Sequence, residues 1–339
     1  MVLFIRKLEI ELTQINKPLL LLLISIIFSI QMKYIKAQSY PNKPITLIVP
    51  TAPGGPIDLT ARIISKQLAI EIGQSIIIIN RPGASQKIGV DSLIKSPKDG
   101  YTIGAVSPAS MTINPILEKN IGYDPVNDLT HLMNAIEYQS VLVIHPSIPA
   151  KNLFEFVSYA RTNPDKLTFG SGGGGSSIHF TTSAFLSLVG IKALHVPYKS
   201  SGPAMLGLLG GEISMLMPDL GDVKSYIQNG QVTGLAISGI YRAKVLPNIP
   251  TFSETNITEL KNWNYTGWIG FAAPNNLPID ISFKLQSALQ ATMKTSSVKE
   301  AFNNIGFQVV ATPSDEFKKQ IQDGLITNRK IANEGNISK

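Results

Sequence analysis

The groups in this chain best suited to chemistry are main-chain N–H groups in a short loop, residues 51–55 (TAPGG). The apolar run 45–49 predicts a buried strand before this loop. Pro56 predicts a helix after it, because proline suits the first helical position, where an N–H would lack a partner. Glycines leave N–H groups uncovered, and a helix start attracts anions. We therefore expect an anionic ligand to contact Thr51, Ala52, Pro53, Gly54, Gly55 and Asp58, the last in the first helical turn.

The glycine loop, residues 170–177 (GSGGGGSS), predicts a second site of the same kind. Residues 167–169 favour a strand before it and residues 178–189 favour a helix after it, with Ser176 or Ser177 as the capping residue. A flexible linker is the alternative, since glycine and serine runs often form linkers. In the first interpretation the ligand contacts Ser171, Gly172, Gly173, Gly174, Ser176 and His179.

Dinucleotide binding is disfavoured, although Gly170, Gly172 and Gly175 match the spacing G-x-G-x-x-G. Such a site also needs an acidic residue about 20 positions later to bind the ribose hydroxyls. Residues 166–211 contain no Asp or Glu, which suits a pocket for an anion instead.

The residues of hydrolases and metal sites are also poorly represented. No serine lies in a G-x-S-x-G motif, the chain has no cysteine, and the histidines at positions 131, 145, 179 and 195 lack metal-ligand spacing. We therefore expect neither catalysis nor a cofactor nor a metal. A secreted hydrolase that uses His179 and a serine of the glycine loop is the alternative.

Further polar residues follow predicted strands. The segment 107–115 comes after the strand 101–106, and open α/β sheets bind ligands beyond the carboxyl ends of their strands. Two positions in the second half of the chain repeat this arrangement. On this basis the predicted ligand contacts also include Ser107, Ser110, Asn114, Tyr198 and Asp219.

The elements that must position these residues alternate along the chain. This alternation predicts an α/β fold with mostly parallel sheets, and the length suits two domains. The predicted strands are 45–49, 75–79, 101–106, 141–145, 167–169, 193–196, 215–218, 234–238 and 268–272. The predicted helices are 57–72, 88–95, 153–163, 178–189, 203–210, 220–230, 279–293, 297–304 and 315–333.

The first 38 residues have the composition of a signal peptide. Arg6, Lys7 and Lys17 precede an apolar run, 18–30, that is short for a membrane span and typical of a signal-peptide core. We expect cleavage near residues 37 and 38 and a periplasmic location; an uncleaved anchor is the alternative. Without residues 1–38 the net charge falls from +7 to about +4. No basic run exceeds two residues, which disfavours nucleic-acid binding.

Ten motifs occur in an order that resembles the Bug family of extracytoplasmic solute receptors, the TctC-like components of tripartite tricarboxylate transporters. They are YPNKPITLIVP, APGGPIDLTAR, INRPGA, PKDGYTIG, INPILE, YDPVNDLTHL, TFGSGGGGSSIHF, HVPYKSSGPAMLGLLGGEI, LPNIPTFSE and WIGFAAPNNLP. The resemblance implies a two-domain, type II-like periplasmic binding protein fold with a hinge and a central ligand cleft. We expect lobe 1 to comprise residues 39–140 and 262–339, lobe 2 to comprise 141–261, and hinges near Val141 and Trp268.

The resemblance also implies the ligand class and the partners. A small carboxylate (a di- or tricarboxylate, an acidic amino acid or an aromatic acid) is held between residues 51–55 and the glycine loop by main-chain N–H groups. We expect a monomer that feeds a membrane transporter or acts as an orphan receptor; a ligand-sensing module for a signalling partner is a further alternative. Ligand identity stays open because the chain departs from the family pattern at Thr51, Ser183, Ser214 and 85–87.

Overall fold

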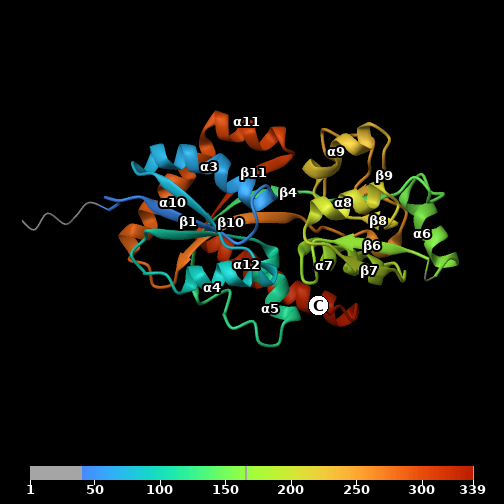
Figure 1. The fold of residues 1–339 in the computed structure, drawn as a ribbon, viewed down its shortest axis with the longest axis horizontal. Helices are drawn as coiled ribbons and strands as arrows, with labels where there is room; N and C mark the ends of the chain where they lie inside the picture. The colour runs from blue at the N-terminus through green and yellow to red at the C-terminus, as the bar shows by residue number, and fades with distance from the viewer. Residues whose placement is uncertain (1–39, 165, 339) are drawn as a thin grey trace, which may run out of the picture. The chain divides into compact units, whose positions relative to one another are not determined.

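The computed structural model describes residues 40–164 and 166–338, so the predicted signal peptide lies outside the described residues. Residues Lys43–Lys339 form one unit that contains two sheets. The first sheet has the strand order β11-β4-β10-β3-β1-β2 and the second has the order β7-β6-β8-β5-β9 (Figure 1). In the part of the chain that the structure describes, no helix is long and apolar enough to cross a bilayer.

The first sheet is built from two stretches of sequence that are far apart. Its strands are β1 (Ile45–Val49), β2 (Ile76–Asn80), β3 (Thr102–Val106), β4 (Leu129–Tyr138), β10 (Gly267–Pro274) and β11 (Phe307–Pro313). Helices cover both faces, with α3, α10 and α11 on one side and α4, α5 and α12 on the other (Figure 1). These helices are α3 (Pro56–Ile72), α4 (Lys87–Ile94), α5 (Asn114–Leu117), α10 (Ile279–Lys294), α11 (Ser296–Asn304) and α12 (Ser314–Glu334), with short turns η1 (Ala84–Gln86) and η2 (Ala109–Ile113).

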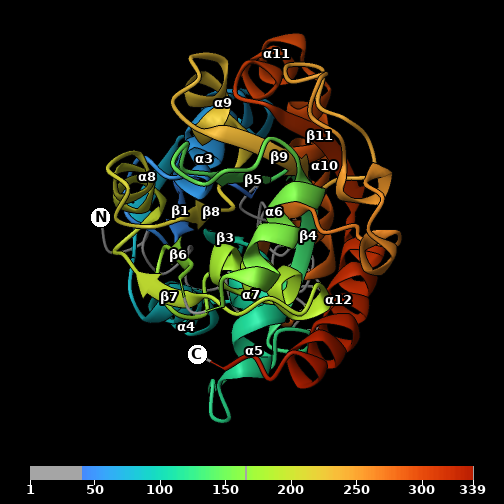
Figure 2. The same ribbon diagram turned by 90° about the vertical axis from the view of Figure 1, so that its right-hand side faces the viewer.

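The second sheet comes from one continuous stretch. Its strands are β5 (Val141–Ile144), β6 (Thr168–Ser171), β7 (Leu194–Pro197), β8 (Met215–Leu216) and β9 (Thr233–Ile237). Helices again lie on both sides of the sheet, as Figure 2 shows. They are α6 (Leu153–Thr162), α7 (Ser177–Leu188), α8 (Ser201–Leu209) and α9 (Leu220–Gln228), followed by the turns η3 (Phe252–Glu254) and η4 (Thr258–Leu260).

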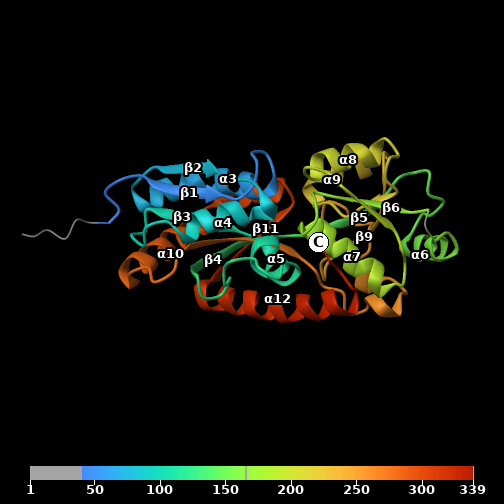
Figure 3. The same ribbon diagram turned by 60° about the horizontal axis from the view of Figure 1, so that its bottom comes forward.

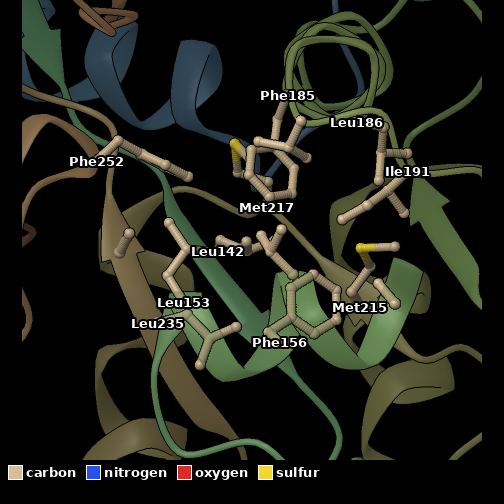
Figure 4. Close-up of a cluster of buried hydrophobic side chains, with 14 of the residues drawn as sticks. Leu142, Leu153, Phe156, Phe185, Leu186, Ile191, Met215, Met217, Leu235 and Phe252 are labelled. Carbon is tan, nitrogen blue, oxygen red and sulfur yellow. The ribbon is translucent and has the colours of Figure 1, made fainter. Parts of the chain in front are cut away.

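The alternating side chains of β5 explain why the second sheet is buried on both faces. Leu142 and Ile144 belong to a buried cluster that includes Phe156 of α6 and Phe185 of α7. Figure 4 shows Leu142 among these side chains. The intervening valines point into a separate cluster with residues of α8 and α9. A strand covered on both faces has no polar side, so it appears in the sequence as an uninterrupted apolar run.

The expectation of mostly parallel sheets was wrong. β1 pairs in parallel with β2 and β3, and β6 does so with β7 and β8. In contrast, β4, β5, β9, β10 and β11 make antiparallel pairs. The physical reason is the chain path: β4 leads from the first sheet to β5 of the second, and β9 precedes the return through β10, so the outgoing and returning strands run in opposite directions.

Two strands that the sequence did not predict, β4 and β11, pair with each other. β4 carries the polar side chains of His131 and Asn134 in fully buried positions, which breaks both the apolar run and the alternating pattern. His131 Nε2 lies 3.0 Å from the Pro125 carbonyl, and Asn134 Nδ2 donates to Gln320 Oε1 at 3.0 Å. Burial lowers the pKa of His131 to about 4, so this imidazole is neutral at pH 7.

The two crossings between the sheets are hydrogen-bonded to each other. The Ser140 N–H donates to Ser238 Oγ at 2.9 Å, and the Ser238 N–H donates to the Ser140 carbonyl at 2.9 Å. Beside them, the rings of Tyr138 and Phe307 stack at 5.2 Å. Ser140 directly precedes Val141, where the sequence predicted one hinge, whereas Ser238 is not near Trp268, the other predicted hinge. The lobes 39–140 plus 262–339 and 141–261 stay a proposal.

A glycine of α4 fixes how closely this helix approaches the end of β1. A Cβ atom at Gly89 would lie 2.6 Å from Pro50 Cβ and 2.7 Å from Pro50 Cα. Such distances are shorter than a van der Waals contact, so only glycine fits here. Pro50 directly precedes the loop 51–55, and the close approach therefore sets where that loop begins.

Replacing Gly89 with alanine should lower the free energy of unfolding by about 1–3 kcal/mol, because the added methyl group overpacks a tight contact. Denaturant titration followed by circular dichroism measures the change. The matched control is Gly202→Ala in α8, where a Cβ meets no atom within 4 Å and no loss is expected. Equal stability of the two variants would contradict the packing explanation.

Candidate functional site

The loop 51–55 is held by hydrogen bonds that turn some main-chain groups inward and others outward. Asn80 Nδ2 donates to the Thr51 carbonyl at 2.9 Å, and the Gly54 N–H donates to Asp58 Oδ2 at 2.9 Å. In a trans peptide the N–H and C=O point in opposite directions. Since the Thr51 carbonyl faces Asn80, the Ala52 N–H faces away from it. The Gly54 N–H, in contrast, is engaged inside the loop.

Asp58 is the centre of this loop rather than an exposed charge. Its side chain is 1% exposed and accepts hydrogen bonds from Arg62 at 2.7 and 3.1 Å and from Asn80 at 2.9 Å. Burial raises the pKa of Asp58, but the hydrogen bonds from Arg62, Asn80 and the Gly54 N–H outweigh it and hold the pKa below its ordinary value. Asp58 is therefore an anion whose lone pairs are already occupied.

The glycine loop, residues 170–177, is organised by Ser171, whose side chain is fully buried. Ser171 Oγ accepts from the Gly173 N–H at 3.1 Å and lies 2.6 Å from His195 Nε2. The Gly173 carbonyl accepts from Ser171 Oγ at 3.1 Å and from the Ser176 N–H at 3.2 Å. Because this carbonyl points into the loop, the N–H of the same peptide, that of Gly174, points out of it.

Ser176 rather than Ser177 caps α7, since its Oγ accepts from the His179 N–H at 3.2 Å. His179 closes the loop from the other side: its Nδ1 accepts from the Gly175 N–H at 3.3 Å. This assignment places the imidazole proton on Nε2. Burial, with a contribution from His195, lowers the pKa of His179 to about 4, so the ring is a neutral support for the loop.

The second imidazole completes a stack of rings beneath the glycine loop. The ring of His195 lies 4.2 Å from that of His179 and 4.8 Å from that of Phe169. Burial lowers the pKa of His195 as well. The glycine loop thus rests on uncharged rings, and its serine contacts His195 instead of His179, the residue that the hydrolase alternative required.

Several N–H groups of the two loops have no hydrogen-bond partner among residues 40–164 and 166–338. They belong to Ala52, Gly55, Gly172 and Gly174 and to the first turns of α3 and α7, apart from the His179 N–H, which donates to Ser176 Oγ. Unpaired N–H groups at helix starts carry a partial positive charge. Both loops therefore offer donors to a negatively charged group without a charged side chain.

The predicted contacts Ser107, Ser110 and Asn114 serve mainly to hold a neighbouring loop. Ser107 Oγ donates to Gln86 Oε1 at 2.8 Å, and Ser110 Oγ donates to the Ser107 carbonyl at 3.1 Å. Asn114 Nδ2 donates to the Ser85 carbonyl at 2.7 Å. Of these partners, residues 85 and 86 were not predicted as site residues, and neither was Asn80. They were missed because side-chain hydrogen bonds leave no periodic signal in the sequence.

The side chains of Tyr198 and Asp219 contact residues outside the two loops. Tyr198 directs its hydroxyl to Glu212 Oε2 at 3.1 Å and lies over Gly207 of α8, where a Cβ would clash with it. Asp219 starts α9 beside the crossing residue Ser140, with which it forms an isolated bridge. Burial and the nearby Asp222 charge raise the pKa of Asp219 well above its ordinary value. The Tyr198 main-chain N–H donates to the Ser171 carbonyl of the glycine loop at 2.9 Å, but neither side chain makes a hydrogen bond to the two loops.

Two basic side chains near the loops are paired with carboxylates. Arg62 is bound to Asp58, and Lys87 of α4 lies 2.6 Å from Asp91. Within the described residues no group of three or more His, Cys, Asp or Glu side chains is placed to hold a metal ion. The unpaired N–H groups of the two loops can thus bind an anion through their oriented dipoles.

Two α/β sheets joined by two crossings are the fold of periplasmic binding proteins. The periplasmic binding protein BugD has this fold with a TM-score of 0.80, at 25% identity over 88% of this chain and 100% of BugD. The family model of the tripartite tricarboxylate transporter family receptor, TctC, matches residues 60–337. The chain belongs to this family, whose members are solute-binding transport receptors and not enzymes, and the resemblance noted in the sequence is confirmed.

Two further similar proteins were solved with a ligand. The R. palustris protein Rpa4515, solved with adipate, is 27% identical to this chain and has a TM-score of 0.81. The match covers 88% of this chain and 99% of Rpa4515. MatC from Rhodopseudomonas palustris, solved with bound malate, is 25% identical, with coverages of 86% and 99% and a TM-score of 0.79. Both ligands are dicarboxylates.

Replacing Asp58 with asparagine should lower the free energy of unfolding by about 2 kcal/mol at pH 7, since charged hydrogen bonds to a buried group are lost. The pKa of Asp58 is lowered in the folded state, so this stabilisation exists above the ordinary aspartate pKa of 3.8 and disappears as the pH falls through the lower folded value. Denaturant titrations across this range should show the difference closing in acid.

The matched control for this variant is Asp91→Asn, which breaks the partly exposed pair with Lys87 one turn away. Its expected loss is below about 0.5 kcal/mol. If both variants lost the same stability, the central role of Asp58 in the loop would be wrong.

The His179 ring should carry its proton on Nε2 and should titrate near pH 4. Two-dimensional NMR of the imidazole nitrogens follows both properties. His195→Gln should raise this midpoint, because it removes the neighbouring imidazole while keeping a polar group near Ser171. A midpoint near the ordinary histidine pKa of 6.5 in the unmodified protein would contradict the buried, supporting role.

Proposed function

We propose that this chain is an extracytoplasmic receptor that binds a small carboxylate between residues 51–55 and the glycine loop. The observation that carries this proposal is the set of outward N–H groups described above, which includes those of Ala52 and Gly174. They lie at two helix starts, where a carboxylate is favoured. The paired state of Arg62 supports binding by dipoles rather than by a salt bridge.

The strength of such binding is consistent with a transport receptor. A hydrogen bond to a charged group contributes about 1.5–3 kcal/mol. Two or three of them, after the cost of ordering the ligand, give micromolar affinity, about 8 kcal/mol in total with apolar contacts. A receptor that must release its solute to a membrane protein needs affinity of this order.

The relatives support a dicarboxylate as the first ligand to test, because adipate and malate are named for two similar structures. The ion pair of Asp58 with Arg62 agrees with this choice, because the neutralised carboxylate does not repel an anionic ligand. We further propose export through the apolar segment 18–30 and delivery of the ligand to a membrane transporter pair.

A panel of purified carboxylates, from C3 to C8 mono- and dicarboxylates to aromatic acids, should raise the melting temperature for one or a few members. A ligand that binds only the folded state stabilises it by mass action. Isothermal titration calorimetry then gives the affinity. If no carboxylate changes the melting temperature, while an uncharged solute does, the proposed ligand class is wrong.

Gly173→Val should abolish the response to the ligand, since φ is +105° at this position and a β-branched residue cannot hold the loop there. The matched control is Gly190→Val, where φ is +66° and a Cβ meets no atom within 4 Å. Both variants should lose similar stability from backbone strain, but only the control should retain binding. Unchanged affinity in Gly173→Val would reject the proposed site.

A further inference from the structure

The segment Ala84–Gln86 holds an uncommon backbone conformation. Ala84, Ser85 and Gln86 have φ values of +45°, +50° and +80°, a region that residues other than glycine rarely adopt. Three such residues in succession cost free energy, and strained segments persist only where their surroundings hold them. Nothing in the sequence indicated this strain.

Two buried side chains from the segment that follows β3 hold the strained segment. Asn114, which is fully buried, donates from Nδ2 to the Ser85 carbonyl at 2.7 Å. Ser107, also buried, donates from Oγ to Gln86 Oε1 at 2.8 Å. One anchor therefore holds the Ser85 carbonyl, and the other holds the side chain of the next residue.

The Ser85 side chain reaches the other lobe. Ser85 Oγ donates to the Gly174 carbonyl at 2.9 Å, which joins a segment between β2 and α4 to the glycine loop after β6. The N–H of the same peptide, that of Gly175, donates to His179 Nδ1 at 3.3 Å. The Gly174–Gly175 peptide is therefore held from lobe 1 at its carbonyl and from lobe 2 at its N–H.

The same segment is also tied to the loop 51–55. Gly89, three residues beyond Gln86, packs directly against Pro50, as described above. Residues 85–89 thus contact the residue before one loop and a carbonyl within the other. Figure 3 shows α4, which begins at Lys87, between β1 and β3 on one side and α5 on the other.

We propose that Ser85 is a positioning residue that holds the two lobes in the closed arrangement and orients the glycine loop for the ligand. This inference rests on the proposed function and deepens it. With the carbonyl of Gly174 held by Ser85, the preceding peptide keeps its N–H free for a carboxylate. If the closed arrangement of the lobes is already populated before binding, less of the binding free energy is used to close them, and the apparent affinity is higher.

We call the hydrogen bond from Ser85 to the Gly174 carbonyl the latch. Other contacts also join the two lobes, so the latch does not have to hold them alone. On the hinge side, Ser140 and Ser238 hydrogen-bond to each other, and Phe180 of α7 is fully buried against Ile113 and Ala332. Phe180 thus adds an apolar contact between the two proposed lobes. The bond from Ser85 is instead one neutral hydrogen bond between a side chain and a loop, so it can bias closure and still release.

The lobe arrangement can be measured without any ligand. Since the chain has no cysteine, Lys66→Cys on α3 and Leu206→Cys on α8 provide two exposed sites for spin labels. In the ligand-free protein, Ser85→Ala should shift the distance distribution from the closed to an open population. The matched control is Ser96→Ala, which removes a hydroxyl that donates to the Ser92 carbonyl within the same lobe, and should leave the distribution unchanged.

Ser85→Gly separates the hydroxyl from the backbone strain. Glycine accepts a φ of +50° without strain, so this variant should keep the loop while losing the latch. Both Ser85 variants should therefore open the lobes, and both should raise the dissociation constant of a carboxylate found in the panel by about 2- to 10-fold.

The outcomes distinguish the latch from the proposed function. If both Ser85 variants keep the distribution of label-to-label distances of the unmodified protein, the proposed role of the latch is wrong, even if carboxylates bind. Opening together with an unchanged dissociation constant would overturn the positioning role. If no carboxylate binds but the variants still open, the latch stands and the proposed ligand class fails.

Discussion

The rest of the site depends on the direction of a few peptide groups. In each loop a carbonyl is drawn inward by a side chain or by a main-chain donor: the Thr51 carbonyl by Asn80, and the Gly173 carbonyl by Ser171 and the Ser176 N–H. Because a trans peptide is rigid, the N–H on the other end of each unit is turned outward. Positive potential is created in this way without a cationic side chain, and a buried lysine or arginine with its desolvation cost is avoided.

The scaffold supplies this direction through two kinds of support. Beneath the glycine loop, His179 and His195 are neutral because burial lowers their pKa, so they act as rigid rings with defined donors and acceptors. Beneath the loop 51–55, Asp58 remains ionised because Arg62 and Asn80 satisfy it. One loop thus rests on uncharged aromatic groups and the other on a closed ion pair, and both leave the site free of competing charge.

The alternation of strands and helices gave most elements to within a few residues, because buried strands and amphipathic helices leave local patterns. β1 was predicted with the bounds that the structure has. β4 was missed because buried polar residues such as His131 and Asn134 interrupt its apolar pattern. β11 was missed because most of its residues are only partly buried. The mixed direction of the sheets was missed because it follows from the chain crossing twice between them, and no local pattern records a crossing.

The sequence by itself determined the two strand–loop–helix units, the family and the kind of chemistry, because glycines, prolines and apolar runs act through local backbone preferences. Only the tertiary structure decided which N–H groups face outward, that Gly54 and Asp58 bind each other, and that Ser85 reaches Gly174. These outcomes depend on contacts between residues from 4 to 89 positions apart, whose geometry is set by packing of whole elements and not by the residues themselves.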